Sequence, residues 1–99
     1  MRQYDVYLAP GAAAQITPYV VVLTSHYMRL RAVLVAPMLA AFSAVESAEL
    51  MVRYEGAEFT LSLLDMAAVE PRALKHCVGS LADQEDAIRR AVDRLFTGF

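Results

Sequence analysis

Hydrophobic and polar positions alternate in the first quarter of the chain. Residues 2–8 place Tyr4, Val6 and Leu8 on one side of an extended strand, with more polar residues between them. Residues 16–24 are rich in β-branched and aromatic side chains, which favour a second strand. Because only a short loop of mainly small residues separates the two stretches, we expect them to pair as an antiparallel hairpin.

The middle of the chain predicts further strands. Residues 32–36 form a third apolar stretch, which Pro37 is expected to close or kink. Residues 49–54 and 58–64 both alternate, and they flank a turn in which Gly56 can adopt the positive φ of a tight hairpin. The pattern therefore predicts a second hairpin.

Two other segments carry weaker patterns. Residues 38–50 are rich in alanine and contain glutamates, which favours a helix, and the same segment also fits an irregular connection. Residues 74–78 predict one more short strand after the break at Pro71.

The end of the chain has the period of an amphipathic helix. Asp83 is expected to cap this helix, and Gly98 stands where a helix commonly ends. Apolar residues recur at helical spacing at Ile88, Ala91, Val92, Leu95, Phe96 and Phe99. Strands followed by one terminal helix predict a single antiparallel α+β domain over residues 1–99.

Composition narrows the class of protein. Hydrophobic residues make up 58% of the chain and the formal net charge is −2. The apolar excess suggests that some surface is buried against another subunit, and the negative charge disfavours a general nucleic-acid binder. The single cysteine excludes an internal disulfide and fits a reducing compartment. No apolar run has the length of a spanning helix, so we expect a soluble cytoplasmic protein and no membrane partner.

Few residues have the spacing of a catalytic or ligand-binding motif. Phosphate-binding loops, dinucleotide motifs and zinc-ligand spacings are absent from the sequence. His76 and Cys77 are neighbours that a strand directs to opposite faces, so we interpret them as an exposed imidazole beside a buried thiol. Asp65 is interpreted as the acceptor of a turn hydrogen bond. We therefore predict no catalytic residue, no cofactor and no metal.

Two features of the last helix concern binding. Arg89, Arg90 and Arg94 lie away from the apolar stripe, either as a solvated face or as a contact face for a partner protein. Phe99 is either docked into the core or displayed as an anchor.

Motifs of the C-terminal third resemble the CcdB family of toxins from bacterial toxin–antitoxin pairs. The resemblance rests on the order and spacing of Leu64-Asp65-Met66-Ala67-Ala68-Val69, Val78-Gly79-Ser80-Leu81, Asp86-Ala87-Ile88 and Ala91-Val92-Asp93-Arg94-Leu95-Phe96-Thr97-Gly98-Phe99. It covers about the last 40 residues well and the earlier chain more weakly.

This resemblance implies an SH3-like barrel of the CcdB/MazF type with a terminal helix, assembled as a homodimer. CcdB-like toxins are not enzymes: they bind the A subunit of DNA gyrase and trap its cleaved DNA complex. A CcdA-like antitoxin neutralises them, and nucleic acid is reached only indirectly, through gyrase or an operator-bound antitoxin.

The resemblance also implies where partners bind. The positions that match gyrase contacts are Asp93, Phe96, Thr97, Gly98 and Phe99, together with His26 and Tyr27 in the loop after the second strand. Arg89, Arg90 and Arg94 are expected to receive the acidic tail of the antitoxin. A displayed helix end further requires Gly98 and Phe99 to be exposed, with Ile88, Val92 and Leu95 buried.

Two departures from the family pattern leave alternatives open. Thr97 replaces a tryptophan of the best-known plasmid toxin, and residues 20–25 lack the polar pattern that the family favours there. A non-toxic protein with the CcdB fold is one alternative. A MazF- or Kid-like endoribonuclease is another, although residues 8–16 carry none of the charge that such an active site needs.

Overall fold

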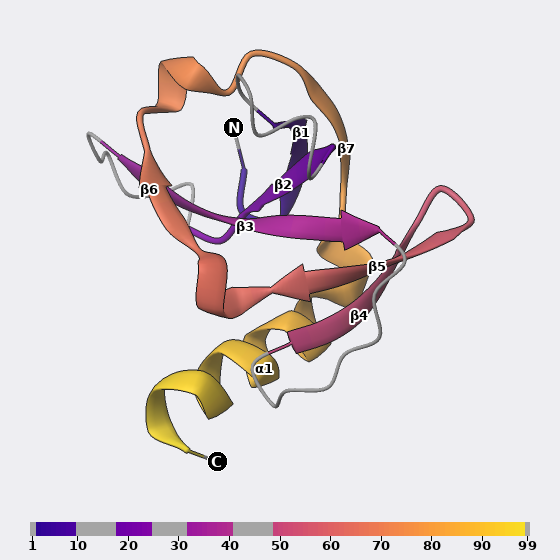
Figure 1. Ribbon diagram of the computed structural model, residues 1–99, viewed down its shortest axis with the longest axis vertical. Helices are drawn as coiled ribbons and strands as arrows, with labels where there is room; N and C mark the ends of the chain where they lie inside the picture. The colour runs from indigo at the N-terminus through magenta and orange to yellow at the C-terminus, as the bar shows by residue number, and fades with distance from the viewer. Residues whose placement is uncertain (1, 10–17, 25–31, 41–48, 99) are drawn as a thin grey trace.

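A computed structural model describes residues 2–9, 18–24, 32–40 and 49–98 of the chain. Seven strands curl around one side of a single α-helix in this part of the protein (Figure 1). The strands are β1 (Asp5–Leu8), β2 (Tyr19–Val22), β3 (Val33–Ala40), β4 (Glu49–Tyr54), β5 (Ala57–Ser62), β6 (Ala67–Val69) and β7 (Cys77–Ser80). Helix α1 covers Glu85–Thr97, and short 3-10 turns cover Leu63–Asp65, Pro71–Ala73 and Ala82–Gln84.

Strand β3 organises the sheet because it pairs along both of its sides. The strand order is β4-β5-β3-β2-β1-β7, and β6 also pairs with β3. On one side β3 pairs with β2, and on the other it pairs first with β6 and then with β5, all antiparallel. The chain bends between β5 and β6, so the sheet is curled into a half-barrel. This confirms the expected antiparallel α+β fold with a C-terminal helix.

Both predicted hairpins are present in the sheet. β1 pairs with β2 in antiparallel register, from Val6 opposite Val21 to Leu8 opposite Tyr19. β4 and β5 meet in a two-residue turn in which Glu55 has φ 52° and Gly56 has φ 77°. Two successive positive φ angles match the right-handed twist of the flanking strands, which explains the glycine at this turn.

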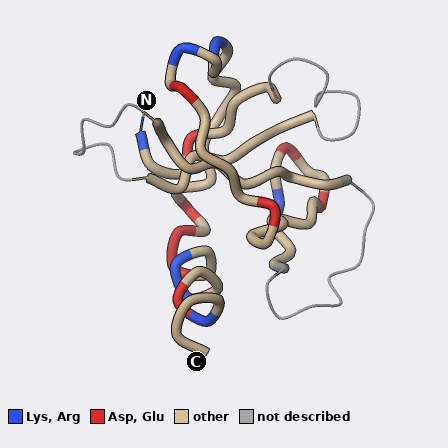
Figure 2. Tube along the Cα trace, turned by 60° about the vertical axis from the view of Figure 1, so that its left-hand side comes forward, with Lys and Arg blue, Asp and Glu red and all other residues tan. Residues whose placement is uncertain are grey.

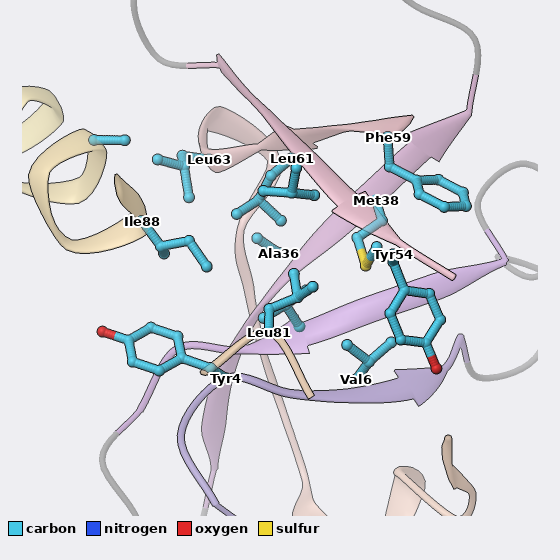
Figure 3. Packing of buried hydrophobic residues seen from close by; sticks show 13 residues of the cluster. Tyr4, Val6, Ala36, Met38, Tyr54, Phe59, Leu61, Leu63, Leu81 and Ile88 are labelled. Atoms are coloured by element: carbon cyan, nitrogen blue, oxygen red, sulfur yellow. The ribbon is translucent and has the colours of Figure 1, made fainter. Parts of the chain in front are cut away.

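The sheet buries apolar side chains on both of its faces. One cluster lies between the sheet and α1, where Ile88 points toward Leu61 and Leu63 (Figure 3). A second cluster on the opposite face contains Val20 and Val22 of β2. Strand β2 is therefore apolar throughout because its successive residues enter two different cores.

Contacts of β4 with β7 and with the turn before α1 close the open side of the half-barrel. The Tyr54 hydroxyl on β4 donates a hydrogen bond of 2.7 Å to the carbonyl of Val78 on β7. Gln84 accepts a hydrogen bond from the Arg53 backbone N–H at 3.0 Å and donates one to the Arg53 carbonyl at 2.7 Å. The Gln84 side chain thus satisfies part of the β4 edge as a neighbouring strand would.

Pro37 does not end the third strand, contrary to the sequence prediction. β3 pairs with β6 as far as Val35 and with β5 from Met38 onward, so Pro37 falls in the gap between the two partners. Proline is tolerated in a strand where its nitrogen has no ladder bond to donate. The strand therefore continues through it.

Other strand boundaries also differ from the predicted ones. The short strand expected at 74–78 is wrong in position, because the edge strand is Cys77–Ser80. Strand β6 was not predicted, since three small residues carry no clear alternation. Of residues 38–50, the two ends belong to β3 and β4, while 41–48 lie outside the described residues.

The expected helix cap is wrong as well. Asp83 lies within the 3-10 turn Ala82–Gln84, and the residue that precedes α1 is Gln84, without a side-chain cap hydrogen bond. The Gln84 side chain is instead used to bind the backbone of β4. The helix start is thus set by its attachment to the sheet.

Candidate functional site

Helix α1 packs one side on the sheet and leaves its last turn free. Ile88 and Ala91 are fully buried, whereas Val92 and Leu95 are half-buried. The burial expected for Ile88 is therefore confirmed, and that for Val92 and Leu95 is only partial. The final turn extends past the sheet in two views of the molecule (Figures 1 and 2).

Gly98 ends this helix as the sequence predicts. It has φ 80°, and its N–H donates a hydrogen bond of 2.8 Å to the carbonyl of Arg94. A left-handed residue after the last turn is a common helix terminus, and glycine adopts that conformation without a Cβ clash. Gly98 is exposed, as expected.

The free end of α1 presents four of the seven residues predicted to contact gyrase. Phe96 is 70% exposed, the largest value among the exposed hydrophobic side chains described, and Asp93 and Thr97 are exposed as well. The Thr97 hydroxyl donates a 2.6 Å hydrogen bond to the Asp93 carbonyl, so this turn is held together locally. Phe99, His26 and Tyr27 lie outside the described residues.

Phe96 stands at the rim of an apolar groove between α1 and the sheet. The groove has a volume of about 320 Å³. Its walls are formed by Gln3, Tyr4, Leu23, Leu34, Met66, Arg89, Val92 and Phe96. Leu34 is 42% exposed there. The sequence patterns missed Leu34 and Met66 as part of this surface, because β3, the turn before β6 and the helix meet only in three dimensions.

The three helix arginines have different surroundings. Arg89 is bound within the protein: its guanidinium lies 3.2 Å from Glu85 and 3.6 Å from Asp86. A hydrogen bond with the Tyr4 side chain is the main reason that the pKa of Arg89 is raised, and Glu85 adds to it. Arg89 therefore remains charged and attaches α1 to the residue before β1.

Tyr4 holds this position with an unusual backbone. Its φ is 70°, in the left-handed region that a tyrosine rarely adopts. Its N–H donates to the Val22 carbonyl at 2.7 Å, and its carbonyl accepts from the Leu81 N–H at 2.8 Å. Bonds to β2 and to the start of the helix region thus keep the buried Tyr4 ring under α1 (Figure 3).

Arg90 and Arg94 face the other way. They line a shallow hollow of about 650 Å³ on the outer side of α1, together with Asp93 and Thr97. Within the described part of the chain, neither arginine takes part in an ion pair. Basic and acidic residues follow one another along this helix (Figure 2).

The residues considered for chemistry elsewhere are dispersed. Cys77 is exposed, so the expected buried thiol is wrong. Strand β7 lies at the edge of the sheet, and its residues Cys77, Val78 and Ser80 are all exposed. His76 is exposed, as expected. Asp65 accepts a 2.7 Å hydrogen bond from the Ser62 hydroxyl, which confirms its role in a turn. Among the described residues, no three His, Cys, Asp or Glu side chains are placed to hold a metal ion.

None of the helices formed by the described residues has the length and apolar character that crossing a bilayer requires.

The fold and the surface together define a class: a small curled-sheet α+β protein that displays the end of its terminal helix. A solved structure described as "Crystal structure of Mtb toxin" has this fold, with a TM-score of 0.65 at 24% identity over 77% of this chain and 89% of that chain. The search of curated proteins found no match to the chain.

Family membership is more specific. The sequence profile described as CcdB protein matches residues 3–98, nearly the whole chain. The chain therefore belongs to the CcdB family, the toxins of toxin–antitoxin pairs that its C-terminal motifs resemble.

Proposed function

We propose that this protein binds the A subunit of DNA gyrase as a homodimer and traps the complex in which gyrase has cleaved DNA. Its membership of the CcdB family over residues 3–98 is the observation that carries this proposal. The protein would then act in the cytoplasm, as a binding protein rather than an enzyme.

The exposed end of α1 supports a binding role at this surface. Phe96 is 70% exposed beside an apolar groove, and exposed aromatic side chains commonly dominate protein interfaces. The rest of the helix is fixed by Ile88 and Ala91 in the core, so little order would have to be gained on binding. We assign to gyrase the described residues Asp93, Phe96, Thr97 and Gly98. The same assignment includes Phe99, His26 and Tyr27, which lie outside the described residues.

Controlled expression tests this function. The full chain and a chain that ends at Phe96 are expressed in a susceptible bacterium, and purified protein is added to gyrase and supercoiled DNA. We expect growth arrest and accumulation of cleaved DNA with the full chain, and loss of both with the shortened one. Growth arrest with RNA cleavage and no gyrase cleavage complex would contradict the proposal, as would unimpaired growth with soluble full chain present.

We further propose that a CcdA-like antitoxin neutralises the protein through Arg89, Arg90 and Arg94. An acidic, flexible tail gains charge-assisted hydrogen bonds when it meets guanidinium groups. Co-expression of the product of the reading frame directly upstream should restore growth. Growth arrest that persists with both proteins soluble would contradict that assignment.

A further inference from the structure

Two polar contacts link helix α1 to distant segments of the described chain. The first is made by Gln84, just before the helix, which binds the backbone of β4. The second is made by Arg89, whose guanidinium donates a hydrogen bond to the Tyr4 side chain. Beyond Arg89 only Ala91 is fully buried among the helix residues, so the last two turns extend from this second contact toward the free end at Thr97.

Tyr4 makes this contact from a strained backbone conformation. It is the third residue of a four-residue turn, in which the Asp5 N–H donates to the Arg2 carbonyl at 3.1 Å and the Asp5 carboxylate accepts from the Arg2 N–H at 2.9 Å. The Tyr4 φ of 70° is one that glycine adopts freely and tyrosine rarely does. Such strain persists only where the surroundings fix it, and it is commonly found where the conformation serves a function.

Both sides of the contact are oriented by further bonds. The Tyr4 N–H donates to the Val22 carbonyl at 2.7 Å, and the Tyr4 carbonyl accepts from the Leu81 N–H at 2.8 Å. The buried Tyr4 ring therefore lies under α1 (Figure 3). On the helix, Glu85 lies 3.2 Å from the Arg89 guanidinium. The two side chains are thus placed before any other protein binds.

The position of this contact along the helix gives it leverage over the free end. Phe96 lies about two turns, or roughly 10 Å, beyond Arg89 along α1. A tilt of about 10° at Arg89 would therefore move Phe96 by about 2 Å. The cores of protein interfaces are packed as densely as protein interiors, so a displacement of this size would disrupt a fitted aromatic contact.

We propose that Tyr4 and Arg89 are positioning residues, whose contact fixes the direction in which α1 displays Phe96. A tyrosine stands at a position that favours glycine because its ring and hydroxyl reach the second turn of the helix. The consequence for gyrase affinity rests on the proposed function. The direction of the helix itself is a property of the unbound protein and can be measured without gyrase.

Two variants of the full chain remove the contact from either side. Tyr4→Phe retains the ring and removes the hydroxyl, and Arg89→Gln removes the guanidinium while keeping a good helix former. Tyr54→Phe is the matched control, since it removes the hydroxyl of another buried tyrosine, whose hydrogen bond to the Val78 carbonyl joins β4 to β7. Circular dichroism checks that all three variants are folded.

Residual dipolar couplings of the backbone amides measure the angle between α1 and the sheet, and surface plasmon resonance measures affinity for the gyrase A subunit. We expect Tyr4→Phe and Arg89→Gln each to change the couplings of residues 93–97 relative to those of the sheet, and to weaken gyrase binding about fivefold. The double variant should lose little more than either single one, because both remove the same contact. Tyr54→Phe should leave the couplings unchanged and alter affinity less than twofold.

Several results would overturn the inference. They are unchanged couplings in both variants, changed couplings with undiminished gyrase affinity, an equal effect of Tyr54→Phe, and fully additive losses in the double variant. Absence of gyrase binding by the natural protein would contradict the proposed function instead, and the couplings alone would then decide whether Tyr4 and Arg89 set the direction of the helix.

Discussion

At the scale of single residues, Gly79 shows how one missing side chain permits the closure of the sheet. A Cβ at this position would lie 2.7 Å from Cε1 of Tyr54, whose ring crosses over β7. The hydroxyl of the same Tyr54 side chain donates a hydrogen bond of 2.7 Å to the Val78 carbonyl. The glycine therefore serves a close approach between two strands that are distant in the sequence.

We predict that Gly79→Ala lowers the free energy of unfolding by about 2 kcal/mol, because the Tyr54 ring must move. The melting temperature should fall by roughly 10 °C, measured by circular dichroism. Tyr54→Phe is the matched comparison, since it removes only one hydrogen bond and should cost about 1 kcal/mol. An alanine variant as stable as the natural protein would contradict the role given to this glycine.

Phe96 is a second single residue with a specific role, and its side chain lies on the surface. Phe96→Ala should weaken gyrase binding by roughly 30-fold, because an exposed aromatic anchor typically contributes about 2 kcal/mol to an interface. The free energy of unfolding of this variant should change by less than about 0.5 kcal/mol, since the Phe96 side chain is 70% exposed. Surface plasmon resonance and thermal melting measure the two effects. Leu8→Ala, at an apolar residue 41% exposed on β1, is the control and should bind normally.

At the scale of elements, the attachment of α1 to β4 depends on one amide. Gln84 lies just before the helix and binds both backbone groups of Arg53. Its neighbour Asp83, which the sequence favours as a cap, has no such partner among the described hydrogen bonds. An amide side chain has both a donor and an acceptor. An ionised carboxylate has only acceptors, and a hydrophobic side chain has neither.

We predict a graded loss of stability at this position. Gln84→Ala removes both hydrogen bonds and should lower the free energy of unfolding by about 2 kcal/mol. Gln84→Glu retains an acceptor for the Arg53 N–H but loses the donor at neutral pH, so an intermediate loss is expected. Urea denaturation measures both values, and equal stability of all three proteins would show that the contact is not stabilising.

At the scale of the whole molecule, the homodimer is proposed from the family and supported by the apolar surface. Leu34 of β3, which is 42% exposed, and Met66 line the groove and are distinct from Phe96 of α1, which we assign to gyrase. Contiguous exposed apolar residues are typical of interaction sites. The net charge of −2 is small enough that two copies would not strongly repel each other.

We predict that the protein elutes as a dimer and that Leu34→Glu shifts it toward a monomer. Light scattering coupled to size-exclusion chromatography measures the mass, and a melting temperature that rises with protein concentration provides a second readout. Leu8→Glu changes a residue of nearly equal exposure, 41%, and should leave the dimer intact. A monomeric natural protein at all concentrations would refute the proposed assembly.

Local patterns were sufficient to predict much of the fold. The hairpin at Gly56, the pairing of β1 with β2, and the terminal helix with Ile88 in the core and Gly98 at its end all follow from periodicity and from turn or helix-end residues. These signals depend only on residues that are neighbours in the sequence. The 70% exposure of Phe96 does not follow from periodicity, because Phe96 belongs to the same apolar stripe as Ile88. It depends on the last turn of α1 extending past the sheet (Figure 1).

The tertiary structure alone decided which groups meet. Pro37 continues β3 because two other strands leave a gap beside it, and Cys77 is exposed because its strand lies at an edge. Arg89 differs from Arg90 because Tyr4, from the other end of the chain, reaches only one of them. The partner of a side chain depends on distant segments that the curled sheet brings together, and no local period in the sequence records that meeting.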